Sequence, residues 1–436
     1  MNNNPAMKVL MFGWEFPPNI SGGLGTACYG LTKSLSAHEG LDITFVVPKV
    51  YGDEAQTSIH LLGANQVDLI RNSLRLERSS LPITRYSVKS LLVPYVDPEV
   101  YPYQTAFSVE GNSGQVASEN ARQINFTGQY GPSLMTEIRN FATVGEYIAG
   151  QNGFDLIHAH DWLTFPAGIA AKKRTGKPLI VHVHATDFDR SGGKVNPQVF
   201  QIEKEGMEQA DCIICVSNRT RDQIIGKYSI SPSKTCTVHN GVEKAPFEHL
   251  PAPKTNFSNK VVTFLGRITL QKGPEYFVRV AELVLSKMKN VWFVMAGSGD
   301  QFPEMVRKVA RAGIASRFLF TGFLKGEDVY RLLKCTDVFV MPSVSEPFGI
   351  CPLEAMQLGV PVIISKQSGV AEVIKHSIKI DFWDVHAMAD AIHGILSHPS
   401  LFSMMAKNGQ MEAQRICWED AAGKIHALYR QLLQTG

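Results

Sequence analysis

Two glutamates, Glu346 and Glu354, lie eight positions apart and are well suited to binding the hydroxyl groups of a ligand. Pro347 and Pro352 make one continuous helix through this segment unfavourable. Pro352 suits the first turn of a helix, so we expect a loop that carries Glu346 and then a helix whose first turn contains Glu354. Backbone amides just before that helix would point outward at its positive end, where phosphate binds. Solvent-exposed acids on an ordinary strand, turn and helix are the alternative.

Two cations, Arg267 and Lys272, lie five positions apart between a predicted strand, 260–265, and a predicted helix, 273–288. Arginine can contact two phosphate oxygens at once, while lysine acts as a point charge, so together they suit a diphosphate. Gly297-Ser-Gly299 follows the next predicted strand and can bring backbone close to a nucleotide. Solvated surface charges and a plain turn are the alternatives.

Two His-x-His pairs end consecutive predicted strands, and alternate residues share a face of a strand. The four are His158, His160, His182 and His184. They suit a metal ion with Asp161 or Asp187 as a further ligand, and equally a sugar-binding cleft or structural packing. Asp187-Phe-Asp189 also matches a short pattern by which some nucleotide-sugar enzymes hold a divalent ion. The residues alone leave these alternatives open.

The elements that must position these groups alternate between strand and helix. An apolar strand at 7–12 leads into a glycine loop, Ser21-Gly-Gly-Leu-Gly25, and a helix at 26–38. The alternation continues to residue 245, a proline-rich linker spans 246–259, and a second series of strands and helices begins at residue 260. We therefore expect an α/β protein with two Rossmann-like, doubly wound domains that face each other across a deep cleft.

The domain boundaries follow from this alternation. The first domain is predicted at 1–250 and the second at 251–415, with a C-terminal helix at 416–436 that packs back on the first. Short strands near 59–62 and 90–93 are expected within the irregular part of the first domain.

The composition excludes several classes of protein. A formal net charge of +3 over 436 residues argues against a dedicated nucleic-acid binder. No apolar run approaches the roughly 20 residues that span a bilayer, and the first strand lacks a signal-peptide pattern, so we expect a cytoplasmic protein without stable membrane association. Seven scattered cysteines do not form a disulfide framework, and Cys212-Ile-Ile-Cys215 is expected to hold buried thiols.

Taken in chain order, five motifs resemble those of the retaining GT-B glycosyltransferases, above all the glycogen and starch synthases and their family 4 relatives. The motifs are Gly22-Gly23-Leu24-Gly25, His158-Ala-His-Asp-Trp162, Asn240-Gly-Val242, Gly266-Arg267 with Lys272, and Glu346-x7-Glu354. They span nearly the whole chain. The resemblance implies a GT-B fold whose second domain binds a nucleotide sugar and whose first domain binds the acceptor.

The resemblance also implies a role for each residue. Catalysis would involve His160, Arg267, Lys272 and Glu346. The donor would be bound by Gly22, Gly23, Asn240, Arg267, Lys272, Gly297, Phe348, Gly349, Ile350 and Glu354. The acceptor would be bound by Asp161, Trp162, His184 and Asp187. Arg267 and Lys272 would stabilise the departing diphosphate, so no metal or other cofactor is expected.

The first loop departs from the bacterial glycogen synthase pattern. That pattern has a lysine two residues before Gly-Gly, where this chain has Ile20, and an aspartate after Leu-Gly, where it has Thr26. These changes leave the donor nucleotide and the acceptor open.

We therefore expect a retaining glucosyltransferase that moves glucose from UDP- or ADP-glucose to the non-reducing end of an α-1,4-glucan. A family 4 enzyme with another acceptor (a lipid-linked sugar, a sugar phosphate or a cell-wall precursor) is the nearest alternative. A non-catalytic sugar-binding protein and a metal-dependent hydrolase that uses the histidine pairs are further alternatives.

Overall fold

The structure is a computed structural model that describes residues 6–20, 22–54, 59–67, 124, 126–128, 130–244 and 259–435. Packing divides the chain into two units. Unit 1 comprises Met1–His182, Asn196–Ile213 and Tyr429–Gly436, and unit 2 comprises Val183–Val195 and Ile214–Leu428. Much of the linker predicted at 246–259 and the strand predicted at 90–93 lie outside the described residues.

The first sheet has seven strands in the order β3-β2-β1-β4-β5-β6-β7. Their bounds are β1 (Met7–Phe12), β2 (Leu41–Val47), β3 (His60–Gly63), β4 (Leu156–His160), β5 (Leu179–Val183), β6 (Cys212–Cys215) and β7 (Thr235–Thr237). β1 pairs in parallel with both β2 and β4, so the strand order reverses at the boundary between β1 and β4. Parallel strands joined by helices are the predicted doubly wound arrangement.

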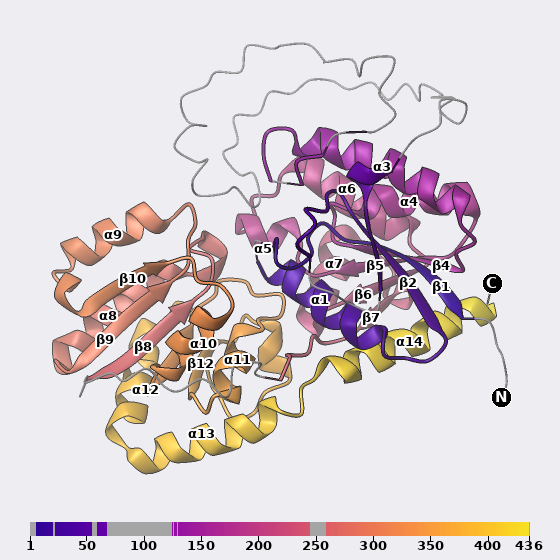
Figure 1. Ribbon diagram of the computed structural model, residues 1–436. Helices are drawn as coiled ribbons and strands as arrows, with labels where there is room; N and C mark the ends of the chain where they lie inside the picture. Colours follow the sequence, from indigo (N-terminus) through magenta and orange to yellow (C-terminus); the bar gives the residue numbers. More distant parts are fainter. Residues whose placement is uncertain are drawn as a thin grey trace, which may run out of the picture. The chain divides into compact units, whose positions relative to one another are not determined.

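The helices of this half divide between the two faces of the sheet. They are α1 (Gly23–Leu35), α3 (Leu134–Gln151), α4 (Phe165–Thr175), α5 (Asp187–Ser191), α6 (Pro197–Gln209) and α7 (Asn218–Tyr228). Because crossover connections are right-handed and the strand order reverses at β1, α1 lies on the face opposite α3 and α4 (Figure 1). α1 begins at Gly23 rather than at the predicted residue 26, and the short helix α5 was not predicted.

The second sheet has six strands in the order β10-β9-β8-β11-β12-β13. Their bounds are β8 (Lys260–Leu265), β9 (Val291–Ala296), β10 (Phe318–Gly322), β11 (Val338–Met341), β12 (Val362–Ser365) and β13 (Ile378–Ile380). The helices are α8 (Pro274–Lys287), α9 (Phe302–Arg311), α10 (Glu327–Lys334), α11 (Cys351–Gln357), α12 (Val385–Ser397), α13 (Pro399–Ala413) and α14 (Trp418–Thr435). Here the order reverses between β8 and β11.

Both faces of the second sheet are buried. Along β11, Val338 and Val340 belong to the core that α8, α9 and α12 cover, whereas Phe339 and Met341 belong to the core on the other face, with α10 and α11. Alternate residues of a strand point to opposite faces, so a strand that is apolar at every position must be covered twice. This explains why the strands of this half read as continuous apolar runs.

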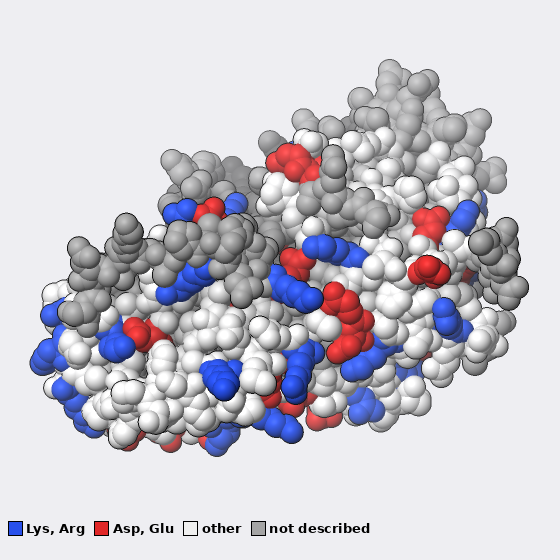
Figure 2. Space-filling model, turned by 60° about the horizontal axis from the view of Figure 1, so that its bottom comes forward, with Lys and Arg blue, Asp and Glu red and all other residues white. Residues whose placement is uncertain are grey.

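None of the seven cysteines forms a disulfide, and Cys215 is buried as predicted. The prediction was wrong for Cys212, which is only partly buried because it lies at the start of β6. No helix among the described residues combines the length and the apolar character needed to cross a bilayer. On the face drawn in Figure 2, basic and acidic side chains are interspersed over the described residues.

The core of unit 2 offers a test of its packing. The Phe277 ring has no exposed surface and lies 5.6, 5.5 and 5.9 Å from the rings of Phe264, Phe293 and Phe318. Phe277→Ala should lower the free energy of unfolding of this unit by about 3–5 kcal/mol, because it leaves a cavity among rigid rings. Urea denaturation measures this loss. The control Phe323→Ala removes a ring that is 49% exposed and should change the stability little; equal losses would contradict the assignment of this core.

Candidate functional site

The reversal of strand order between β8 and β11 brings two segments of unit 2 together at the carboxyl ends of the strands, which is where ligands bind in such sheets. Arg267 and Lys272 follow β8, and the loop 342–350 follows β11. Gly273 connects them at close range, since its φ is +65° and a Cβ there would lie 2.1 Å from the carbonyl oxygen of Pro342. Only glycine fits this position, so the first turn of α8 lies directly against the start of the Glu346 loop.

Glu346 and Lys272 form an ion pair in this loop. The Glu346 side chain is 6% exposed and that of Lys272 is 22% exposed. The Ser343 hydroxyl donates to the same Glu346 oxygen, Oε2, at 3.3 Å. A carboxylate buried to this degree requires a cation or several donors, because its ionised form is otherwise poorly solvated. The two residues assigned from sequence to the sugar and the diphosphate are therefore in direct contact.

The backbone around Glu346 is fixed by the loop that follows β12. Glu346 N donates to Gln367 O at 2.9 Å, and Gly369 N donates back to Glu346 O at 2.9 Å. Val370 N donates to Phe348 O at 2.8 Å. Within the described part of the chain, the amides of Phe348 and Gly349 donate to no backbone carbonyl. These two amides are the donors that the sequence assigned to phosphate, and Ile350 directly precedes α11.

Glu354 lies in the first turn of α11, with a proline among the first residues of that helix, as predicted. Burial raises the pKa of Glu354 to about 7, and the nearby Glu243 acts in the same direction, while a hydrogen bond with Cys351 opposes them. A carboxyl group with this pKa changes its charge near neutral pH.

The loops after β8 and β9 touch through backbone. A Cβ on Gly297 would lie 1.9 Å from the carbonyl oxygen of Gly266, and Ile268 N donates to Ser298 O at 2.8 Å. Arg267 lies between these two contacts. Burial raises the pKa of the neighbouring Asp300, and the Arg267 charge opposes that shift. Gly297 is thus required for the close approach of two loops, whatever it does for a ligand.

In unit 1 the glycine loop leads into α1. Gly22 precedes the helix and Gly23 begins it, and no side chain caps this end. A Cβ on Gly25 would lie 2.4 Å from the Ile20 side chain and 2.9 Å from the Glu15 carboxylate. Ile20, the residue that departs from the bacterial glycogen synthase pattern, therefore packs against the loop.

Three of the four histidines stack in the core of unit 1. The ring of His158 lies 4.4 Å from that of His160 and 5.5 Å from that of His182, and His158 Nδ1 lies 2.6 Å from the hydroxyl of Tyr429. One ligand atom from each of these histidines lies within 4.8 Å of the others, so the group has the proximity that a metal ion would need. His160 has no exposed surface. Contact between His160 and a sugar would therefore require the side chains that cover His160 to move.

Asp161 and Trp162 follow β4 directly. Asp161 is 1% exposed and has φ of +59°, a conformation that is strained for aspartate and is concentrated at functional sites. Its amide donates to the carbonyl oxygen of His182 at 2.9 Å. Trp162 is also 1% exposed, so its ring fills the core and supports the Asp161 turn.

The remaining predicted residues lie in unit 2. Asn240 is 7% exposed and precedes Gly241 and Val242; the Val242 amide donates to Ile416 O at 3.1 Å. His184 and Asp187 follow β5 and are 9% and 4% exposed. Burial lowers the pKa of His184 to about 3, so this imidazole is neutral at physiological pH.

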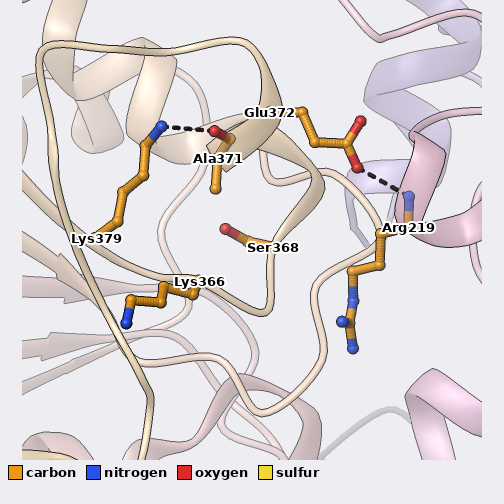
Figure 3. A pocket seen from close by; sticks show the side chains of 6 residues that line it. All are labelled: Arg219, Lys366, Ser368, Ala371, Glu372 and Lys379. Carbon is orange, nitrogen blue, oxygen red and sulfur yellow. Dashed lines mark hydrogen bonds between the residues drawn. The ribbon is translucent and has the colours of Figure 1, made fainter.

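A cavity of about 300 Å³, which no sequence pattern indicated, lies beside the Glu346 loop. Its lining residues are Arg219, Lys366, Ser368, Ala371, Glu372 and Lys379. Figure 3 shows Lys366 and Lys379 on one side of the cavity and Arg219 on the other. Ser368 forms a parallel bridge with Glu346, so the cavity and the candidate donor site share a loop.

The sequence also did not predict the hydrogen bonds that hold Ser345 beside Glu346. Asp189, Ser345 and Arg219 form a hydrogen-bonded chain in unit 2, and its middle member, Ser345, directly precedes Glu346. The pattern Thr186-x-x-Asp189 is a capping-box signal and indicates that Asp189 closes a helix start. No local pattern indicates its contact with Ser345, which is 156 positions away.

Two family models match consecutive parts of the chain. Residues 103–245 match the model described as glycosyltransferase family 4, and residues 248–412 match the model described as glycosyl transferases group 1. The two matches meet where the first series of strands ends and the second begins.

Individual proteins agree with these models. An uncharacterized glycosyltransferase of Methanocaldococcus jannaschii is 25% identical over 97% of this chain and 98% of its own length. The glycogen synthase of Mycobacterium tuberculosis is 23% identical over 92% of this chain and 89% of its own. Two solved structures share the fold: the sucrose-phosphate synthase of Thermosynechococcus elongatus (TM-score 0.72, 20% identity, 99% of this chain and all of the other), and HepE of Anabaena in complex with UDP and glucose (TM-score 0.66, 17% identity, 97% and 99%). Two parallel-sheet domains, the two consecutive family matches and these relatives together identify the chain as a GT-B glycosyltransferase of the family 4 and 5 type.

Proposed function

We propose that this enzyme is a retaining glucosyltransferase that moves glucose from UDP- or ADP-glucose to the non-reducing end of an α-1,4-glucan. The observation that carries the proposal is the Lys272–Glu346 ion pair at the point where the strand order reverses, with Glu354 in the first turn of the next helix. The likeness to a glycogen synthase over 92% of the chain supports the glucan, and HepE, solved with UDP and glucose, supports a nucleotide-sugar donor.

In this proposal the donor separates the ion pair. The diphosphate takes Lys272 and Arg267 as partners, the amides of Phe348 and Gly349 add hydrogen bonds, and Glu346 is left to accept hydroxyls of the transferred glucose. Two fixed cations stabilise the charge that grows on the departing diphosphate, so the reaction needs no metal ion.

The remaining site residues receive roles in the same proposal. Ile350 and Gly297 frame the nucleotide, with the ribose diol on Glu354. Within unit 2, Asn240 adds to donor binding, and His184 and Asp187 are assigned to the acceptor. The donor phosphate takes the acceptor proton as the new bond forms on the same face of the sugar, which retains the α configuration.

Glu346→Gln tests the central role. The change keeps the size of the side chain and removes its charge, so kcat for glucose transfer should fall about 100- to 1000-fold, while the Kd for UDP or ADP changes far less. Release of nucleoside diphosphate, with and without glycogen, and calorimetric binding measure the two quantities. Glu327→Gln, on the exposed surface of α10, is the matched control. Full activity in Glu346→Gln would refute the assignment, and loss of wild-type activity in EDTA would refute the metal-free mechanism.

Glu354 predicts a pH dependence of donor binding. Its ionised carboxylate accepts hydrogen bonds from both ribose hydroxyls, whereas the protonated form loses acceptor capacity. Because the pKa is about 7, affinity for UDP or ADP should be full above pH 8 and should weaken as the pH falls through 7. Titration of the Kd from pH 5.5 to 8.5 measures this. Glu354→Gln carries no ionisable group, so its profile should lack this step; identical profiles for the two proteins would contradict the role.

The cavity beside the Glu346 loop favours a second candidate acceptor, a sugar that carries a phosphate. Three cations and one carboxylate, that of Glu372, line it, and Lys366 is paired with Asp381 at 2.9 Å. Glu372 already accepts from the amides of Asn218 and Arg219 at 2.9 and 2.8 Å. Lys379 Nζ donates to the carbonyl oxygen of Ala371 at 2.7 Å, a partner that carries no net charge.

The strand order supports this candidate. β12 and β13, which carry or adjoin Lys366 and Lys379, continue the second sheet beyond β11, on the side away from β9 and β10. A nucleotide placed against the β8 and β9 loops would leave the β12–β13 side for the acceptor.

The two acceptors separate by experiment. If the acceptor is phosphorylated, glucose 6-phosphate or fructose 6-phosphate should accept glucose where the unphosphorylated sugar does not. The double change Lys366→Ala and Lys379→Ala should then raise KM for that acceptor at least about tenfold without changing the Kd for UDP. Lys308→Ala, on α9 and paired with Glu275, is the control. Transfer to glycogen but to no sugar phosphate would reject this candidate and retain the glucan.

A further inference from the structure

The carboxyl group of Asp189 is held from several directions within unit 2. It completes the capping box of α5, where Oδ2 accepts from the Thr186 amide at 2.9 Å and from the Thr186 hydroxyl at 3.1 Å. Gln223, on α7, donates to the same oxygen at 3.1 Å. Asp189 is 2% exposed, so a solvated divalent ion would have to displace these donors. Asp189 therefore has a structural role at the start of α5.

The other oxygen of Asp189 reaches the Glu346 loop. Ser345 Oγ donates to Asp189 Oδ1 at 2.6 Å, and Arg219 Nη2 donates to the same hydroxyl at 3.1 Å. Ser345 is 9% exposed, so water competes little for either bond. The serine hydroxyl thus donates to a carboxyl group and accepts from a guanidinium, an arrangement that fixes the orientation of its O–H.

Arg219 is itself anchored. Its amide and that of Asn218 donate to the carboxylate of Glu372, so the start of α7 is fixed to the loop after β12. On the other side, the amides of Val344 and Ser345 donate to Gln271 O at 2.9 and 3.4 Å. Ser345, which directly precedes Glu346, is therefore held through its side chain by Asp189 and Arg219. It is held through its backbone by Gln271, which directly precedes Lys272.

We propose that Asp189 is a positioning residue for sugar transfer: through Ser345 it holds the Glu346 loop in the geometry that meets the transferred sugar. The inference rests on the proposed role of Glu346. Because the Asp189 carboxyl is buried, it acts through Ser345 and does not touch the donor. Once the diphosphate takes Lys272 from Glu346, the Asp189–Ser345–Arg219 chain still orients the loop. Misplacement of a catalytic group by about 1 Å can cost about 100-fold in rate, so the contact matters for turnover more than for nucleotide affinity.

Ser345→Ala is the cleanest test, because it removes one hydroxyl and leaves the Thr186 and Gln223 contacts of Asp189 intact. The kcat for transfer from UDP- or ADP-glucose should fall about 10- to 100-fold, with the Kd for UDP or ADP within about threefold of wild type. Asp189→Asn should lower kcat as well. In the Ser345→Ala background it should have little further effect, since the same chain is already broken. Ser286→Ala, an exposed serine on α8, is the matched control.

Amide hydrogen exchange of 343–350 in the free protein gives a readout that needs no substrate. Faster exchange of this segment in Ser345→Ala than in wild type and in Ser286→Ala supports the positioning role. Unchanged exchange, unchanged kcat, or additive losses in the double variant would each overturn it. Wild-type protein that transfers no glucose from either donor would defeat the proposed function, and the exchange result would still decide whether Asp189 orders the loop.

Discussion

The candidate donor site depends on the ion pair of Lys272 and Glu346. A carboxylate that is 6% exposed needs a cation or several hydrogen-bond donors beside it to offset the loss of water. Lys272 supplies the cation, and the Ser343 hydroxyl supplies a donor. Backbone contacts hold the two residues of this pair in place. Gly273 allows α8 to start against Pro342, and the carbonyl oxygen of Gln271 accepts from the amides of Val344 and Ser345. The loop after β12 holds Glu346 through backbone hydrogen bonds with Gln367 and Gly369. In the proposed function, a diphosphate would replace Glu346 as the partner of Lys272, so one charged partner of the lysine would be exchanged for another.

The strand order explains why these groups meet. In each sheet the order reverses once, between β1 and β4 and between β8 and β11. Except for Asn240, which follows β7, the candidate residues lie at the ends of those four strands or of their neighbours. At a reversal the connecting helices go to opposite faces, which leaves the loops at the strand ends uncovered. The glycine loop and the histidine strand end in one sheet, and Arg267 and the Glu346 loop in the other, occupy corresponding positions.

The sequence predicted the features that depend on residues close together in the chain. Alternating strands and helices gave the two doubly wound halves, and Pro352 gave the loop before α11 and the place of Glu354 in its first turn. The start of α1 was mispredicted because glycine is a poor helix former. Close packing against Ile20 and Glu15 accounts for glycine at position 25, whereas a Cβ on Gly23 would meet nothing within 4 Å. The sequence showed no sign of α5, which is too short for a periodic pattern, or of the Asp189–Ser345 contact, because pairings between distant segments leave no local signal. The two His-x-His pairs were predicted to lie at the ends of consecutive strands. In the structure, His158 stacks against His160 and His182 in the buried core of unit 1.

The contact between His158 and Tyr429 links the order of synthesis to the order of folding. Unit 1 includes Tyr429–Gly436, so its packing draws on residues that emerge after the whole of unit 2. Domains generally fold as units, from the N-terminus onward, as the chain is made. His158, on the central strand β4, has its hydroxyl partner on α14, which is synthesised only after the whole of unit 2. Unit 1 therefore cannot complete its packing before α14 has been made, and its stability depends on residues that lie about 270 positions beyond β4.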